Sequence, residues 1–299
     1  MNRTASPAIA FSVAAAGIGF FSLMDAAMKD LSIALGAYNA VMWRNMAGAV
    51  LAGILFVAQR QPWPTAMVLR VHAWRSIVVA VMAISFFWAI ARLPLAEAIG
   101  LSFIAPVIAL YLAAIMLGEK IGREAIIASV AGLAGVAVIL MGRFSSEYTQ
   151  DALWGVVAVL FSAVVFAYNL ILARQQAQIA GPIEIAFFQS LLVAAVLGIA
   201  APFLLEPLPP AKLPMLMGAA VLAIISLLLL SWAYARAEAQ ILIPVEYTGF
   251  VWAALFGWMF FAEPVTIWTV IGTALIVAGS LVAARVKSLP VNQVEMAST

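Results

Sequence analysis

Two opposite charges stand four residues apart in an apolar stretch near the N-terminus. In the segment FFSLMDAAMKD, Asp25 and Lys29 share one face of a helix, because side chains four residues apart are neighbours on a helix surface. A buried carboxylate can hold an ammonium group or a proton, and a lysine can hold a carboxylate. The spacing indicates either a site for a charged solute or a pair that neutralises itself and reaches the aqueous end of the helix.

An arginine lies inside the next apolar segment, AYNAVMWRNMAGAV. The guanidinium of Arg44 can grip a carboxylate with two parallel hydrogen bonds. It can also serve structure, by pairing with Asp25 or Asp30 or by binding free backbone carbonyls, and we favour this structural or gating role. In either case the arginine must face protein or water, since exposure to lipid at this depth is costly.

A third ionisable group follows a proline in ILIPVEYTGF. Pro244 lacks a backbone N–H, so it kinks a helix and frees a carbonyl group. Glu246 beside such a kink suits an amine or a proton, with Tyr247 as its neighbour in the site. The alternative is a structural ion pair between Glu246 and Arg236.

Aromatic, hydroxyl and amide side chains recur within the apolar segments. A cavity that combines aromatic walls with a few polar groups suits an amphipathic organic solute better than an ion. The alternative is packing within the protein or an aromatic belt at the membrane surface. The candidates for such a cavity are Ser85, Trp88, Phe103 ahead of Pro106, Tyr168, Asn169, Ser226 and Trp232.

Several chemistries are excluded by what the sequence lacks. The chain has no cysteine and one histidine, His72, which lies in a basic segment and is expected to be a solvated loop residue. A nucleophile with its base, a metal cluster and the phosphate loop G-x-x-x-x-G-K-[ST] are all missing. We therefore expect no enzyme activity, no metal and no cofactor. The net charge of +2 is scattered along the chain, which excludes a nucleic-acid partner.

The composition is that of a membrane protein. Hydrophobic residues make up 66% of the chain, charged residues 9%, and the mean hydropathy is +1.13, whereas soluble domains are about 25% charged. Continuous apolar runs favour helices over a β-barrel. We expect an all-α polytopic membrane protein, surrounded by the lipid bilayer, with ten spans near 8–29, 37–58, 73–91, 95–117, 124–142, 152–173, 182–203, 213–233, 239–261 and 265–284.

Basic residues distinguish the two faces of this ten-span arrangement. With both termini on one side, that side carries ten of the fifteen lysines and arginines. Basic residues concentrate in cytoplasmic loops. The pattern therefore predicts cytoplasmic termini and, in a bacterium, location in the inner membrane.

The two halves of the chain are weakly similar to each other. A shift of 144 residues superposes Trp88 on Trp232, Arg92 on Arg236, Glu119 on Glu263 and Gly135 on Gly279, and a shift of 145 superposes Lys29 on Arg174. Several matches at half the chain length indicate a duplicated five-span unit. Because five is odd, the second unit enters the membrane from the opposite side. Inverted repeats of this kind place the substrate site near the midplane, at their interface.

The same segments resemble the EamA-type exporters of the drug/metabolite transporter superfamily. The resemblance covers residues 8–287 and rests on MDAAMKD, AVMWRNMAGA, LPLAEAIGLSFIAPVIALYLAAIMLGEKIG and its second-half counterpart AEAQILIPVEYTGFVWAALFGWMFFAEPVT. It implies two inverted five-helix repeats around a central cavity, over residues 1–147 and 148–290, and a cytoplasmic tail at 291–299. It also implies alternating access, and within the superfamily the chain is similar to the exporters of aromatic amino acids.

The resemblance implies the substrate site residue by residue. We expect a monomeric inner-membrane exporter of amino acids, aromatic or otherwise neutral, or of similar small metabolites, with protons as a further ligand of Asp25 or Glu246. The alternatives are a drug or lipophilic-cation exporter of the same superfamily and, further from the pattern, a membrane-embedded enzyme. The residues expected around the cavity are Asp25, Lys29, Ser85, Trp88, Phe103, Tyr168, Asn169, Ser226, Trp232, Glu246 and Tyr247, with Arg44, Pro106 and Pro244 in structural or gating roles.

Overall fold

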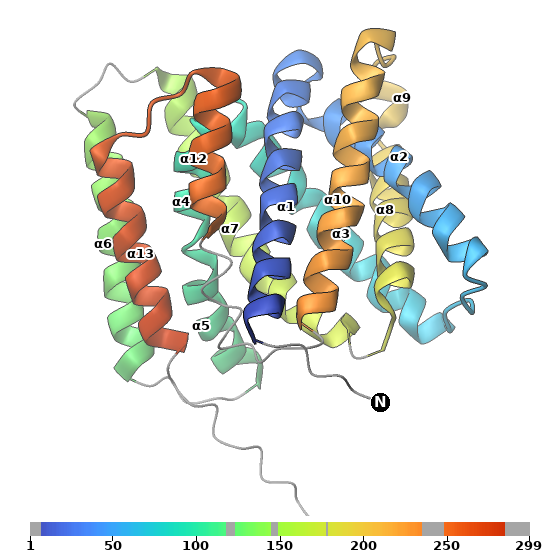
Figure 1. Cartoon of the computed structure of the whole chain (residues 1–299), viewed down its shortest axis with the longest axis horizontal. Coiled ribbons are helices and arrows are strands. Elements are labelled where there is room, and N and C mark those ends of the chain that lie inside the picture. The colour runs from blue at the N-terminus through green and yellow to red at the C-terminus, as the bar shows by residue number, and fades with distance from the viewer. Residues whose placement is uncertain (1–6, 118–122, 145–148, 178, 235–247, 285–299) are drawn as a thin grey trace, which may run out of the picture.

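The computed structural model describes residues 7–117, 123–144, 149–177, 179–234 and 248–284 (Figure 1). All regular secondary structure in these ranges is helical. The helices are α1 (Pro7–Leu35), α2 (Ala37–Ala58), α3 (Ala66–Ile90), α4 (Leu95–Ser102), α5 (Ala105–Leu117), α6 (Arg123–Phe144), α7 (Gln150–Ala177), α8 (Pro182–Gly198), α9 (Ala201–Leu204), the 3-10 helix η1 (Pro210–Lys212), α10 (Leu213–Tyr234), α12 (Thr248–Phe261) and α13 (Ile267–Ala284).

The predicted all-helical membrane fold is confirmed, and each predicted span overlaps a described helix. Within α1, α2, α3 and α7, and from η1 into α10, the chain forms helices that are long and apolar enough to cross a membrane. Shorter apolar helices supply the other spans. The fourth span is interrupted: α4 ends at Ser102 and α5 begins at Ala105. Pro106 is the second residue of α5 and has no N–H to continue the ladder back to Ser102, so the break falls where the sequence placed a proline.

The two halves are arranged as an inverted repeat. The first helix of the first half, α1, begins at the lower end of Figure 1, whereas its counterpart α7 begins at the upper end. Contacts between helices follow the same symmetry. Helices α7 and α10 of the second half correspond to α1 and α3 of the first, and α1 packs on α10 as α7 packs on α3. Helix α2 packs on its own counterpart, α8. Matched contacts of this kind are the expected result of a two-fold relation between repeats.

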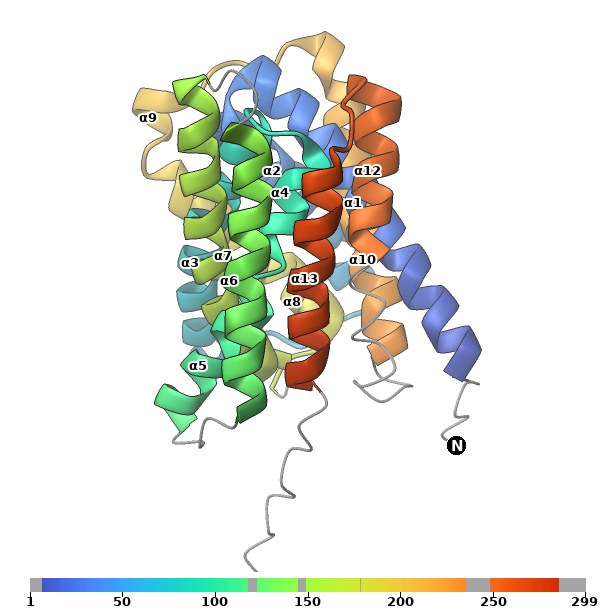
Figure 2. The same ribbon diagram turned by 90° about the vertical axis from the view of Figure 1, so that its left-hand side faces the viewer.

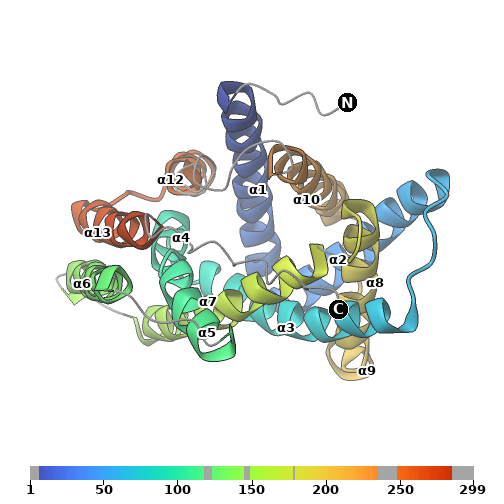
Figure 3. The same cartoon turned by 90° about the horizontal axis from the view of Figure 1, so that it is seen from below.

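The last helices of the two halves, α6 and α13, lie side by side at one end of the molecule, and α2 with α8 occupies the other end (Figures 2 and 3). Glycines allow the first pair to approach closely. A Cβ on Gly135 would lie 2.4 Å from the carbonyl oxygen of Gly272, and one on Gly272 would lie 2.5 Å from that of Gly135. The two backbones are therefore in direct contact, as small residues permit between membrane helices.

Replacing Gly135 with alanine is expected to destabilise the protein by roughly 1–3 kcal/mol, because the added methyl group meets backbone that cannot move aside. Gly218 is the matched control, since a Cβ there meets nothing within 4 Å. Alanine at residue 218 should leave the protein as stable or more so, by about 1 kcal/mol, because alanine is the better helix former. Thermal unfolding of both variants in detergent checks this, and equal melting temperatures would refute the close contact.

The third helix starts earlier than the predicted span. It begins at Ala66 and not near residue 73, and the hydroxyl of Thr65 caps it by accepting a hydrogen bond from the N–H of Val68 at 3.4 Å. His72 therefore lies inside α3 with no exposed surface. The prediction of a solvated loop histidine is wrong, because the charges around it are held by partners from distant parts of the chain.

Candidate functional site

The first helix carries a buried polar stripe. Ser22, Asp25, Lys29 and Ser32 are each at most 4% exposed, and steps of three and four residues align them on one face. Helix α1 packs against α2, α3, α10 and α12, so it lies among helices of both halves. Polar and charged groups inside an apolar membrane helix are costly, which makes this face the first candidate for a functional site.

Lys29 connects the two halves of the molecule. Its Nζ donates to the carbonyl oxygen of Leu93, 2.5 Å away, and forms an ion pair with Glu263. The second carboxylate oxygen of Glu263 accepts a hydrogen bond from the N–H of Leu95 at 2.8 Å. The ammonium group also lies 5.1 Å from the ring centre of Phe261. One ion pair thus joins α1 to the α3–α4 junction and to the α12–α13 junction, and the structure gives Lys29 a different carboxylate from the predicted Asp25.

Asp25 is left with an unfilled acceptor. Its Oδ2 atom is buried and accepts no hydrogen bond from the described residues. Arg44 of α2 lies close enough for its charge to act on Asp25. The guanidinium does not close an ion pair among the described residues: its Nη2 lies 3.5 Å from Oδ1 of Asn45, and its Nε has no hydrogen-bond partner. Asp25 is buried and Arg44 is partly buried, and each has a buried hydrogen-bonding atom without a partner among the described residues.

The other acidic residue considered for Arg44 has its own partner. Asp30 forms an ion pair with Lys212 of η1, with 2.6 Å between Oδ2 and Nζ. The Asp30 and Lys212 side chains are 37% and 30% exposed, whereas those of Lys29 and Glu263 are 4% and 18% exposed. The end of α1 therefore makes two ion pairs with the second half of the chain, one mostly buried and one partly exposed.

Ser85 and Trp88 lie together on a hollow between α3 and α7. The hollow has a volume of about 390 Å³ and is lined by Ile84, Ser85, Trp88, Trp154, Val157, Ala158 and Phe161. The Ser85 hydroxyl donates to the carbonyl oxygen of Val81 at 2.7 Å, and the Arg92 guanidinium lies 3.6 Å from the ring centre of Trp88. The hollow shares no residue with the polar stripe of α1, so it is a separate place in the fold.

Tyr168 and Asn169 of α7 contact the first part of α3. The Tyr168 hydroxyl accepts a hydrogen bond from the indole N–H of Trp74 at 3.0 Å, and Oδ1 of Asn169 accepts one from Nε of Arg75 at 2.9 Å. Arg75 also donates to the Gln176 side chain. These contacts tie α3 to α7 and place both predicted residues in a polar cluster between these helices.

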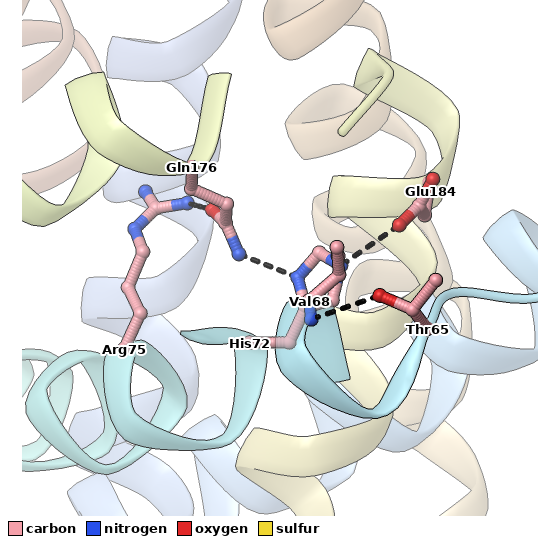
Figure 4. A network of polar contacts seen from close by, with 6 residues as sticks. All are labelled: Thr65, Val68, His72, Arg75, Gln176 and Glu184. Atoms are coloured by element: carbon pink, nitrogen blue, oxygen red, sulfur yellow. Dashed lines mark hydrogen bonds and ion pairs between the residues drawn. The ribbon is translucent and has the colours of Figure 1, made fainter. Parts of the chain in front are cut away.

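Figure 4 shows how that cluster continues to α8. Nδ1 of His72 lies 2.5 Å from the Gln176 amide nitrogen, and its Nε2 lies 3.1 Å from Glu184 at the start of α8. The imidazole ring also stacks on Phe188, with 5.3 Å between ring centres. Glu184 is therefore a hydrogen-bond partner of a buried histidine.

Replacing Gln176 with alanine is expected to cost about 1–3 kcal/mol of stability, because it leaves buried groups of His72 and Arg75 without their partner. The adjacent Gln175 is exposed and serves as the control. Alanine there should change stability by less than about 0.5 kcal/mol. Melting temperatures of the two purified variants provide the comparison, and an equal loss in both would contradict the network.

A smaller pocket borders the Lys29–Glu263 ion pair. It encloses about 200 Å³ and is lined by Pro94, Ala96, Glu97, Ile139, Gly142, Pro264, Val265, Thr266 and Thr269. Pro94 and Ala96 flank Leu95, and Pro264 follows Glu263, so the pocket abuts the segments that the ion pair joins. The hydroxyls of Thr266 and Thr269 lie 2.8 Å apart and give it a polar wall.

The remaining predicted residues are spread over the fold. Phe103 follows the end of α4, at the break before Pro106. The hydroxyl of Ser226 in α10 is fully buried and has no hydrogen-bond partner in the part of the chain that the structure describes. Trp232 packs against the contact of Ala14 with Ala233. Pro244, Glu246 and Tyr247 lie outside the described residues. The predicted site residues that the structure describes therefore lie in several separate places. Their charged members, Asp25, Lys29 and Arg44, lie on the polar stripe of α1 and on the neighbouring helix α2.

Sequence reasoning missed the partners of these groups. Glu263 appeared in the sequence only as the repeat counterpart of Glu119, whereas in the structure it is the carboxylate that binds Lys29. Arg75 and Gln176 were not singled out. The signal available for them was that Arg75 follows His72 at one helical turn, on the same face of a helix that starts at Ala66.

Metal chemistry receives no support from the described residues. Over the described ranges, no three His, Cys, Asp or Glu side chains gather closely enough to hold a metal ion. What the α1 site offers instead is a carboxylate and a guanidinium with free acceptor and donor atoms. Such groups bind charged solutes or protons without covalent chemistry.

Comparisons with known proteins agree with this arrangement. The pseudopaline exporter CntI of Pseudomonas aeruginosa is 29% identical over 276 residues, which cover 89% of this chain and 93% of that protein. A riboflavin transporter of Rhizobium johnstonii is 24% identical over 261 residues, covering 86% and 82% of the two chains. One protein crystal structure with 19% sequence identity superposes with a TM-score of 0.62 over 93% of this chain and 98% of its own, which shows a shared fold.

The family match covers both halves separately. Residues 8–141 and 153–285 each match the EamA-like transporter family. The two matches coincide with the two inverted five-helix halves seen in the contacts between helices. The chain therefore belongs to the EamA-like transporter family.

Proposed function

We propose that the protein exports amino acids, or small metabolites that likewise carry an ammonium and a carboxylate group, across the bacterial inner membrane by alternating access. The unit is a monomer with both termini in the cytoplasm, the side that receives most of the basic residues. The observation that carries the proposal is that an acidic and a basic side chain, Asp25 and Arg44, act on each other and each has a buried atom without a hydrogen-bond partner among the described residues.

A zwitterionic solute complements these two groups. Its ammonium group can donate to the free oxygen of Asp25, and its carboxylate can accept from the guanidinium of Arg44. Charge-assisted hydrogen bonds of this kind are worth about 1.5–3 kcal/mol each. They also favour a solute that neutralises the site, since a buried charge without a partner is costly.

The relatives support an organic solute. Proteins named as exporting pseudopaline and as transporting riboflavin align with most of this chain. Both names refer to small organic molecules. The carboxylate-and-guanidinium pair narrows this class, for the present chain, to solutes with both signs of charge.

A lipophilic-cation exporter is the competing function within the same family. A carboxylate alone would suit such a cation, and Asp25 is a buried carboxylate. The charge of Arg44 acts on the same carboxylate and would repel a cation that offers it no anion. The zwitterionic solute is therefore the better match.

Stabilisation of the purified protein by ligands tests the solute class. Neutral amino acids, including phenylalanine, tryptophan and methionine, should raise the melting temperature, because a ligand that binds the folded state stabilises it. Their amides, which lack the carboxylate, and tetraphenylphosphonium should have smaller effects. Stabilisation by tetraphenylphosphonium alone would favour the lipophilic-cation function.

A further inference from the structure

The ion pair of Lys29 stands one helical turn from a second carboxylate. Asp25 and Lys29 are both on the polar stripe, yet the lysine binds Glu263 while Oδ2 of Asp25 stays without a hydrogen bond. Side chains at this spacing can pair on a helix. By its spacing on the helix, Asp25 could compete with Glu263 for Lys29 after a change of side-chain conformation. The structure shows the arrangement in which Lys29 binds Glu263.

The charged side chains near Asp25 determine which groups can pair with its carboxylate. Arg44 acts on it from α2, and Lys29 lies on its own helix. The described stretches of α10 (Leu213–Tyr234) and α12 (Thr248–Phe261) contain no charged residue. In α3, the charged or titratable side chains Arg70, His72 and Arg75 lie near the beginning of the helix, at the end opposite to Leu93. Lys29 and Arg44 are therefore the described cations that determine the charge balance at Asp25.

A proton on Asp25 accounts for the observed arrangement. An ionised carboxylate that is 2% exposed and leaves an oxygen without a donor is costly, and protonation removes that charge. Lys29 is then free to bind Glu263 and Leu93. When Asp25 loses the proton, its negative charge competes with Glu263 for Lys29. The contact of Lys29 with Glu263, which joins the two halves of the molecule, then weakens.

We propose that Asp25 is a proton-binding site whose occupancy decides which carboxylate holds Lys29, and thereby whether the Lys29–Glu263 contact between the two halves is closed. This inference rests on the proposed alternating access and names its coupling ion. It also assigns Lys29 a positioning role, because the lysine acts through the contact that it makes or releases.

The proposal gives a balanced exchange. The ammonium group of a solute that enters from the cytoplasm displaces the proton from Asp25, and that proton leaves to the cytoplasm. The ionised carboxylate then also attracts Lys29, the contact with Glu263 opens, and the solute leaves on the other side. A proton from that side binds Asp25 and restores the contact. In each cycle that carries a solute outward, one proton moves inward.

A distance measurement without any solute tests this coupling. The chain contains no cysteine, so cysteines introduced at Ile33 of α1, in the first half, and Phe260 of α12, in the second half, can carry spin labels with no background. Both side chains are exposed, at 58% and 53%. Double electron–electron resonance in nanodiscs then reports the separation of the two halves near the Lys29–Glu263 contact as the pH is varied.

In the unchanged background, raising the pH should increase the population with the longer distance, by at most about tenfold per pH unit for a single proton. Asp25→Asn is neutral at every pH, so it should keep the short distance throughout. Glu263→Gln removes the competing carboxylate and should show the longer distance throughout. Asp25→Glu restores a titratable carboxylate and should recover the pH response.

A pH response that persists in Asp25→Asn, or a background protein whose distance does not change with pH, would overturn the proposal. Asp25→Glu keeps the test decisive if the asparagine variant fails to fold, because loss of the pH response in the folded glutamate variant would overturn it as well. Since no solute is present, this outcome is independent of the ligand test for the proposed function.

Discussion

Replacing Glu263 with glutamine is expected to destabilise the protein by about 3 kcal/mol, because it leaves the buried ammonium group of Lys29 without its compensating carboxylate. The loss should be recovered in part by the double variant Lys29→Met with Glu263→Gln, since that change removes the charge as well. The coupling between the two substitutions in thermal or denaturant unfolding measures the ion pair itself.

The neighbouring pair of α1 supplies the control for this prediction. Asp30, the residue after Lys29 in α1, forms an ion pair with Lys212, but both side chains are about one third exposed. Lys212→Met should therefore cost less than about 1 kcal/mol. Equal losses for Glu263→Gln and Lys212→Met would show that the Lys29–Glu263 contact does not hold the halves together.

Replacing Arg44 with glutamine is expected to raise the KM for transport of neutral amino acids by about 10- to 100-fold, the equivalent of losing one charge-assisted hydrogen bond. Uptake by liposomes that contain the purified variant measures this directly. Arg44→Lys keeps the charge but cannot form two parallel hydrogen bonds, so it should fall between the glutamine variant and the unchanged protein.

Arg60 provides the matched arginine for that experiment. Arg60 is exposed and lies two residues beyond the end of α2, the helix that carries Arg44. Arg60→Gln should leave KM unchanged. If both glutamine variants transported with the KM of the unchanged protein, Arg44 would have only the structural role that the sequence also allows.

Much of the fold could be predicted because membrane helices follow local rules. Apolar length located the spans, and Pro106 marked the break between α4 and α5. The early start of α3 was missed because hydropathy treats Arg70, His72 and Arg75 as loop residues. The burial of His72 depends on Gln176 and Glu184, which are more than 100 residues away in the chain, and no local pattern can show such partners.

For the candidate site, the sequence indicated which charged residues lie inside apolar segments but not which of them pair. Asp25, Lys29 and Arg44 were identified by their charge inside apolar segments, and the structure places them on adjacent helices. The spacing of Asp25 and Lys29 favoured a pair within α1, whereas tertiary structure brought Glu263 to the lysine. By the internal repeat, Lys29 corresponds to Arg174 and Glu263 to Glu119, whose side chains lie outside those described.

The most direct test of the proposed function is accelerated exchange in liposomes that contain the purified protein. Vesicles loaded with unlabelled neutral amino acids should take up the labelled compounds faster than empty vesicles, and the rate should saturate, because a carrier with alternating access returns faster when loaded. Uptake of amino acids no faster than in protein-free vesicles, together with exchange of labelled tetraphenylphosphonium, would contradict the assignment of a zwitterionic solute.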